Sequence, residues 1–205
     1  MKAGARAPQR GDDAALDALL IEVRACRHCA ADLPLGPRPV LSASVTAKLL
    51  IVGQAPGTKV HETGIPFDDP SGDKLRQWLD VDRDTFYDRS RIAIVPAGFC
   101  YPGRGKGGDL PPRAECAPLW HPRLGALMGA IGLTLLLGAY AQAYYLGPRR
   151  KATLAATVGA YEDYLPAYLP TPHPSPRTRL WLKRNPWFEA DVVPELRRRV
   201  HALIG

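Results

Sequence analysis

The apolar positions of the chain fall into short runs separated by longer segments of mixed polarity. Residues 48–52 (KLLIV), 91–95 (RIAIV) and 133–137 (LTLLL) are too short for typical helices and predict buried strands. A shorter run at residues 167–169 predicts a fourth strand. Short buried strands that alternate with helices favour an α/β fold, in which a mainly parallel sheet is covered on both faces.

Helices are predicted between and around these strands. The first begins at Asp12 or Asp13 and presents an apolar face made of Leu16, Leu19, Leu20 and Val23. Another begins at Ser71 or Asp73 and continues to Leu79. The remaining helices are expected around residues 123–130, 139–146 and 154–164, and at the carboxyl end with a break at Pro186. Residues 31–47 and the Gly- and Pro-rich residues 101–119 are predicted to be loops.

Length and hydropathy limit the possible architectures. A chain of 205 residues that is 46% hydrophobic can bury one substantial core, so residues 12–205 are expected to form a single domain. Residues 1–11 are polar and are expected to be a disordered tail. No apolar run is long enough to span a membrane, and no signal peptide is recognised, so a cytoplasmic monomer without a membrane partner is expected.

The charge of the chain suggests a polyanionic partner, although many basic proteins bind none. The formal net charge is +7 and the pI is about 9.4. Residues 197–199 are three arginines that read most simply as the solvated face of a last helix. The arginines and lysine of residues 177–184 differ, because they follow a Pro-rich loop that contains a histidine.

Four cysteines are the only cysteines of the chain: Cys26, Cys29, Cys100 and Cys116. A C-x2-C pair followed at a distance by a second pair suits a metal or iron–sulfur site that ties two segments together. Two disulfides or unrelated core thiols are the alternatives, but disulfide frameworks are typical of small secreted domains. Zinc remains possible, yet zinc ribbons usually contain two short C-x2-C knuckles. A cluster is therefore the favoured interpretation.

Unusual loops follow three of the predicted strands: residues 53–57 (GQAPG), residues 96–103 (PAGFCYPG) and residues 170–177 (PTPHPSPR). In parallel sheets, ligands bind beyond the carboxyl ends of the strands, so these loops predict one shared site. Familiar motifs do not explain them. The first loop lacks the Lys-Ser/Thr of a P-loop, and His61-Glu62 is not followed by the second histidine of a metalloprotease.

Together, these features resemble the uracil-DNA glycosylase superfamily. Residues 53–67 (GQAPGTKVHETGIPF) resemble its first motif, G-[EQ]-x-P-G followed by G-x-P-F, and residues 173–175 (HPS) resemble its second. The cysteine spacing is similar to that of the iron–sulfur branch, the family-four enzymes. The resemblance implies a three-layer α/β/α sandwich with a central, mainly parallel four-stranded sheet. It also implies a structural [4Fe–4S] cluster on the four cysteines.

The resemblance assigns roles to residues of both motifs. Phe67 would stack on a flipped-out uracil, although it could also be an ordinary core residue. His173 would hydrogen-bond a uracil carbonyl as negative charge develops on the leaving base, although a loop histidine bonded to backbone is the simpler alternative. The backbone of Gly53, Ala55 and Gly57 would face the base and the attacking water. Gln54 would contact the uracil edge or position the water.

Two positions depart from the family pattern. Ala55 stands where the classical enzymes have an aspartate that orients water, which leaves His61, Glu62 and Asp68 as candidates for that task.

The second departure is Pro96, which stands where the family usually has an asparagine that reads the pyrimidine edge. Backbone groups of Ala97 and Gly98 or the side chain of Gln54 would then read uracil, or the base selectivity differs.

The loop after His173 is where relatives enter the base stack and grip phosphates. Ser175, Arg177 and Arg179 are therefore expected to contact DNA, with helix capping or simple solvation as the alternative. The basic, Gly-rich residues 103–108 are either a mobile DNA contact or an ordinary flexible loop.

The expected function is that of a monofunctional glycosylase that hydrolyses uracil from single- or double-stranded DNA and leaves an abasic site. No lysine is evidently placed as a Schiff-base nucleophile. A non-catalytic iron–sulfur protein that binds nucleic acid, and a glycosylase for hypoxanthine or xanthine, are the alternatives. The protein would associate with the nucleoid through DNA.

Overall fold

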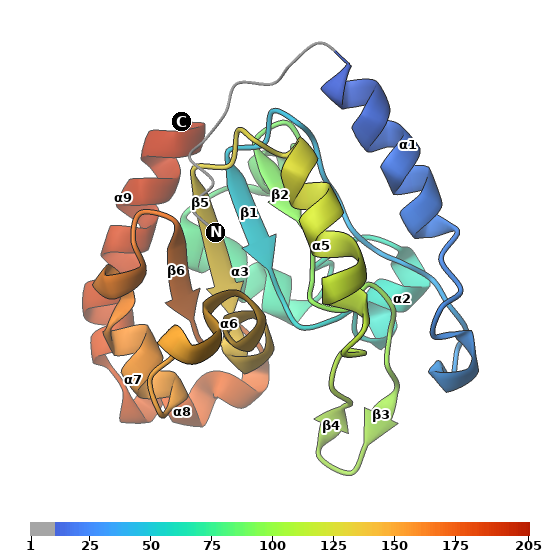
Figure 1. The fold of residues 1–205 in the computed structure, drawn as a ribbon. Helices are drawn as coiled ribbons and strands as arrows, with labels where there is room; N and C mark the ends of the chain where they lie inside the picture. The colour runs from blue at the N-terminus through green and yellow to red at the C-terminus, as the bar shows by residue number, and fades with distance from the viewer. Residues whose placement is uncertain (1–10) are drawn as a thin grey trace.

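A computed structural model describes residues 11–205 and shows a central parallel sheet (Figure 1). Its strands are β1 (Leu49–Val52), β2 (Ile92–Ile94), β5 (Leu133–Leu137) and β6 (Tyr168–Thr171). They lie in the order β2-β1-β5-β6, and each neighbouring pair is parallel. The predicted α/β fold with a four-stranded sheet is therefore confirmed.

Side chains of the strands belong to two separate hydrophobic cores. Leu49 and Ile51 of β1 belong to one buried cluster, whereas Leu50 and Val52 belong to the other. Successive side chains of a strand point to opposite faces of the sheet. Because both faces are covered, both sets must be apolar. This explains why the strands appear in the sequence as uninterrupted apolar runs.

Helices cover both faces of the sheet (Figure 1). The core on one face contains residues of α1 (Asp12–Arg24), α5 (Cys116–Leu127) and α6 (Gly138–Leu146). The core on the other face is formed with α3 (Pro70–Leu79), α4 (Arg83–Tyr87), α7 (Leu154–Gly159), a π-helical turn at Phe188–Val192 and α9 (Val193–Ile204). Two further short helices, α2 (Thr58–Thr63) and α8 (Arg179–Arg184), follow loops at the carboxyl ends of β1 and β6.

Several predicted boundaries are wrong for local reasons. Helix α3 starts at Pro70 rather than at Ser71 or Asp73, because the carboxylate of Asp69 caps it by accepting the N–H of Gly72 at 3.0 Å. The helix predicted at 123–130 begins earlier, at Cys116. Helices α2 and α4 are short and were not predicted. The helix predicted over 154–164 ends at Gly159 and continues as a 3-10 turn.

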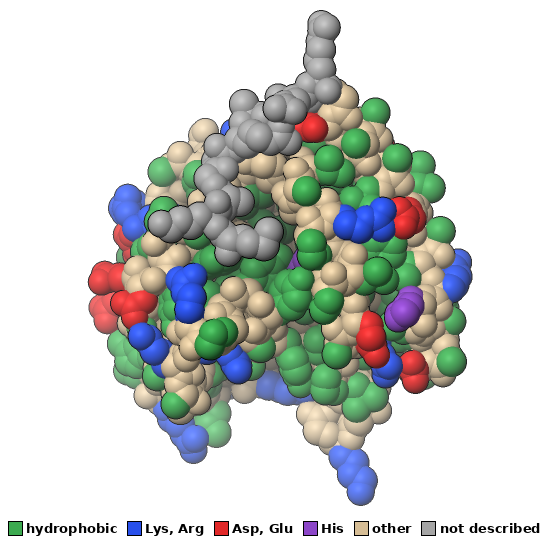
Figure 2. Space-filling view, in the orientation of Figure 1, with side chains coloured by type: hydrophobic (Ala, Val, Ile, Leu, Met, Phe, Trp, Pro, Cys, Tyr) green, Lys and Arg blue, Asp and Glu red, His purple; other side chains and the backbone are tan. Residues whose placement is uncertain are grey.

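Residues 101–119 are not one irregular loop. They contain an antiparallel hairpin of β3 (Arg104–Gly105) and β4 (Gly108–Asp109), followed by the first turn of α5. The hairpin projects from the body of the protein, and Figure 2 shows a Lys or Arg side chain at its tip. Arg104 and Lys106 are both exposed. The expectation of an unstructured loop is therefore corrected.

Every helix within residues 11–205 is too short or too polar to cross a membrane. The predicted tail, residues 1–11, lies outside the described residues except for Gly11, which precedes α1.

Candidate active site at the carboxyl ends of the strands

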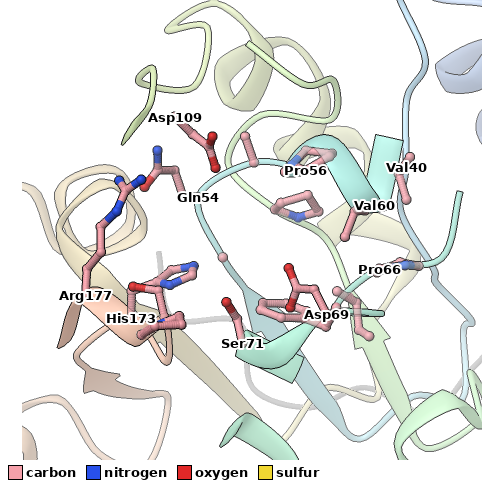
Figure 3. A pocket seen from close by; sticks show the side chains of 18 residues that line it. Val40, Gln54, Pro56, Val60, Pro66, Asp69, Ser71, Asp109, His173 and Arg177 are labelled. Atoms are coloured by element: carbon pink, nitrogen blue, oxygen red, sulfur yellow. The ribbon is translucent and has the colours of Figure 1, made fainter. Parts of the chain in front are cut away.

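A pocket of about 450 Å³ lies at the carboxyl ends of the strands (Figure 3). The loops after β1, β2 and β6 all contribute to it, as the sequence predicted, and so do the start of α3 and strand β4. Its lining, called the main pocket below, comprises Val40, Gly53, Gln54, Ala55, Pro56, Gly57, Val60, Pro66, Phe67, Asp69, Ser71, Ile94, Pro96, Asp109, His173, Ser175, Pro176 and Arg177.

Phe67 forms part of the pocket wall and has a strained backbone. Its φ of 55° lies in the left-handed region, which is unfavourable for a bulky residue. Two glycines make its position possible. A Cβ at Gly72 would collide with the carbonyl of Phe67, and a Cβ at Gly53 would lie 3.1 Å from the Phe67 Cζ. Such strain persists only where the surrounding structure enforces it, and it is common at functional sites.

His173 stands beside Phe67, with ring centroids 6.4 Å apart and ring planes 30° apart. The loop after β6 is held there by two contacts. The Thr178 hydroxyl donates to the His173 carbonyl, and Gly138, with a φ of 79°, approaches the loop so closely that a Cβ would lie 3.2 Å from His173 Cβ. These contacts hold the backbone and the Cβ of His173 in place beside the pocket.

The imidazole of His173 is neutral at neutral pH. Its ring opens onto the pocket but otherwise lies deep in the fold, and this burial lowers its pKa to about 4, against the opposing effect of Asp69 and Asp109. A neutral imidazole carries one N–H donor and one acceptor nitrogen. Within residues 11–205, neither ring nitrogen has a hydrogen-bond partner. The donor is therefore available to a ligand in the pocket.

Gln54 lines the pocket and also anchors the hairpin. Its side-chain Nε2 donates to the carbonyl of Leu110 at 3.1 Å, and this contact joins the loop after β1 to the end of the hairpin. A carbonyl can only accept, so the amide nitrogen must face Leu110. Gln54 is thus placed at the predicted site, with one of its N–H groups already used.

The loop after β2 is bonded to the loop after β1. The N–H of Ala97 donates to Gly53 and that of Gly98 donates to Gln54, both at 2.9 Å. Neither Ala97 nor Gly98 lines the main pocket. A base contact through their N–H groups, one of the predicted alternatives, would require these bonds to break.

Pro96 lines the pocket, and its carbonyl group is hydrogen-bonded to the buried histidine His121. Nε2 of His121 donates to the Pro96 carbonyl at 3.0 Å, so Nδ1 must accept from the Tyr145 hydroxyl at 2.8 Å. Burial lowers the pKa of His121 to about 4, which keeps this tautomer neutral. The role of His121 was not predicted, because its partners come from distant parts of the chain.

Of the residues predicted to position water, Gln54 lines the pocket, whereas His61, Glu62 and Asp68 do not. His61 and Glu62 are on α2, where Glu62 is exposed and the His61 ring is 6.1 Å from that of Tyr101. Asp68 forms an ion pair with Arg83 at 2.9 Å.

The structure instead brings three unpredicted polar residues into the pocket: Asp69, Ser71 and Asp109. Asp69 and Ser71 lie shortly after the G-x-P-F motif, which ends at Phe67, and could have been found from it. Asp109 could not, because the hairpin was not predicted.

Of the predicted DNA contacts, Ser175 and Arg177 line the pocket, whereas Arg179 is exposed on α8 outside it. Arg177 lies against the hairpin. Gly108 has a φ of 123°, and a Cβ there would overlap the guanidinium of Arg177. The loop after β6 and the hairpin therefore meet at the mouth of the pocket.

The four cysteines come together around a second, small cavity of about 30 Å³, called the cysteine cavity below. All four are free thiols. The backbone N–H of Phe99 donates to Cys116 Sγ at 3.4 Å. Burial raises the pKa of Cys100 to about 11 and that of Cys116 to about 12. Among residues 11–205, no three His, Cys, Asp or Glu side chains converge closely enough to hold a single metal ion.

The family of the chain follows from comparison with known protein families. Residues 41–197 match the family described as the uracil DNA glycosylase superfamily. The match covers more than half of the chain and contains the three loops of the main pocket. Members of this superfamily are glycosylases that act on DNA and hydrolyse N-glycosyl bonds. With the parallel α/β sheet and the pocket at its carboxyl edge, the chain belongs to the uracil DNA glycosylase superfamily.

Proposed function

We propose that this protein is a monofunctional DNA glycosylase that removes uracil from DNA and leaves an abasic site. The observation that carries the proposal is the pairing of Phe67 with the unpartnered, neutral imidazole of His173 in the main pocket. A cavity of about 450 Å³ is of the size that proteins use for small ligands.

The aromatic wall suits a flipped-out base. A base within a duplex cannot be reached, so the nucleotide must leave the stack and enter the pocket. Stacking of a base on an aromatic side chain stabilises binding by about 1–3 kcal/mol. Phe67 provides such a face, and Gly53 leaves room beside it.

His173 supplies the electrostatic part of the reaction. When the bond between C1′ and the base breaks, its electron pair and negative charge stay on the base. A fixed N–H that points at the developing anion stabilises the transition state most when it is held in a site shielded from water. Because the imidazole is neutral, it can donate this hydrogen bond without first taking a proton from solvent.

The lining of the pocket favours simple hydrolysis. Within the described residues, no lysine lines the main pocket, so no amine is in place to form a Schiff base with the deoxyribose. Base removal without strand cleavage is the expected outcome.

The test is incubation of the protein with an oligonucleotide that contains one uracil, followed by alkali. Strand cleavage should appear only after alkali and only when uracil is present. Separate oligonucleotides that contain hypoxanthine or xanthine test the alternative base selectivity, which is considered because Pro96 replaces the usual asparagine. An intact strand for all three bases would contradict the proposed activity.

Arg177 and Arg179 offer a matched pair for testing DNA contact. Each Arg→Ala change that removes a phosphate contact should reduce the magnitude of the salt slope of binding by about one. Because Arg177 also lines the pocket, Arg177→Ala should lose more activity on paired than on single-stranded uracil, whereas Arg179→Ala should not. The measurement is affinity and rate on both substrates at several salt concentrations. Unchanged slopes with a lowered Tm would assign these arginines to the fold.

We further propose that the cysteine cavity holds a [4Fe–4S] cluster of structural function. The chemistry of the donors supports this, since four free thiols and no carboxylate line the cavity. Their spacing along the sequence supports it as well. A C-x2-C pair is followed by a distant second pair, whereas zinc ribbons usually contain two short C-x2-C knuckles.

The cluster would tie the beginning of the chain to the pocket. Cys26 and Cys29 follow α1, whereas Cys100 and Cys116 flank the segment that contains the hairpin. When bound, the cluster would cross-link these two segments of the chain. No step of the hydrolysis is assigned to it.

A further inference from the structure

We propose that Asp109, on strand β4 of the hairpin, is the catalytic residue that accepts a proton from the attacking water. This inference rests on the proposed glycosylase function and adds a residue that neither sequence motif contains. The carboxylate enters the main pocket from the hairpin, next to Gln54 and Arg177 (Figure 3).

The position of Asp109 is defined by contacts on both sides. One of its carboxylate oxygens, Oδ2, would be 3.6 Å from a Cβ placed on Gly57, so the carboxylate reaches the loop after β1. The next residue, Leu110, is held by the side chain of Gln54. The preceding residue, Gly108, is covered by Arg177. The hairpin is therefore fixed to two pocket loops at the position of Asp109.

Other groups of the pocket are less suited to this task. Only two acidic side chains line the main pocket within the described residues, Asp69 and Asp109. Asp69 already accepts the N–H of Gly72 as the cap of α3. The carboxylate of Asp109 has no hydrogen-bond partner among residues 11–205, and it is exposed, so water reaches it. Ala55 has no polar side-chain atom.

The proposed step balances as a hydrolysis. The water oxygen forms a bond to C1′ while the bond from C1′ to the base breaks, and the electron pair of that bond leaves with the base. One proton of the water passes to the Asp109 carboxylate, and the departing base accepts a hydrogen bond from the N–H of His173 and then takes a proton from solvent. The proton on Asp109 then returns to solvent.

Two arginines lie close to Asp109. Arg104 is its cross-strand partner in the hairpin, and Arg177 lies against the adjacent Gly108. His173 and Asp69 face it from the other elements of the pocket. Of these four residues, only Asp69 carries a negative charge.

The test measures the rate of base release by Asp109→Asn and by the unchanged protein. The enzyme is in saturating excess over the oligonucleotide, so that each substrate molecule reacts once. Loss of a general base should lower the rate of base release by roughly 10²–10⁴-fold. DNA affinity should stay equal or rise, because a negative charge is removed. Added formate should partly restore Asp109→Ala, which a purely structural role would not allow.

Asp84→Asn is the matched control, since it removes a similar exposed carboxylate on α4, away from the pocket. It should keep the rate of the unchanged protein. An Asp109→Asn protein that releases base as fast as the unchanged one would overturn the assignment and leave the glycosylase function intact. An unchanged protein that releases no base from any oligonucleotide would instead overturn the function and the assignment together.

Discussion

His173→Ala is expected to lower the single-turnover rate of base release by roughly 10²-fold or more, a loss of about 2.7 kcal/mol in transition-state stabilisation. The substitution removes the only histidine donor that the structure places in the main pocket among residues 11–205. The loss should appear in the chemical step, which is measured with enzyme in excess over a uracil-containing oligonucleotide. Because burial lowers the pKa of His173 to about 4, its protonation should begin to affect the rate only as the pH approaches that value.

Two variants make this experiment specific. His61→Ala removes a histidine that lies outside the pocket and should leave the rate almost unchanged. Phe67→Ala should mainly weaken base capture, by about 1–3 kcal/mol of lost stacking. If His173→Ala and Phe67→Ala both react at the normal rate, the site has been placed wrongly.

Cys116→Ala is expected to give insoluble or unstable protein. Structural zinc contributes about 10–16 kcal/mol to the folding of zinc-finger peptides, which is comparable with the roughly 5–15 kcal/mol by which most domains are stable. Without a cluster, α1 and the segment of the hairpin would lose their connection. Solubility, thermal unfolding and iron content measure the outcome.

The unchanged protein provides the direct comparison. It should be brown and carry about four irons per chain. Cys26→Ala, at the other end of the cross-link, should show the same defect as Cys116→Ala. A colourless protein with one zinc ion would exclude the cluster, and stable, metal-free protein in both variants would exclude any structural metal.

The structure also changes which residues are expected to handle water. His61 and Glu62 were reasonable candidates because they follow the GQAPG loop closely in sequence. Both residues lie on helix α2, however, and neither lines the main pocket. Asp109 is far from both motifs in sequence and enters the pocket only through the hairpin.

The sequence by itself determined the parallel α/β fold, because strands buried on both faces must be continuously apolar. It also located the main pocket, since loops after parallel strands meet at one edge, and both Phe67 and His173 line the pocket there. The tertiary structure decided what depends on contacts between distant segments. Among these are the neutral state of His173, the support of Pro96 by His121, and the meeting of Arg177 with the hairpin. Burial and packing between distant segments produce these features, so they cannot be predicted from the local sequence around each residue.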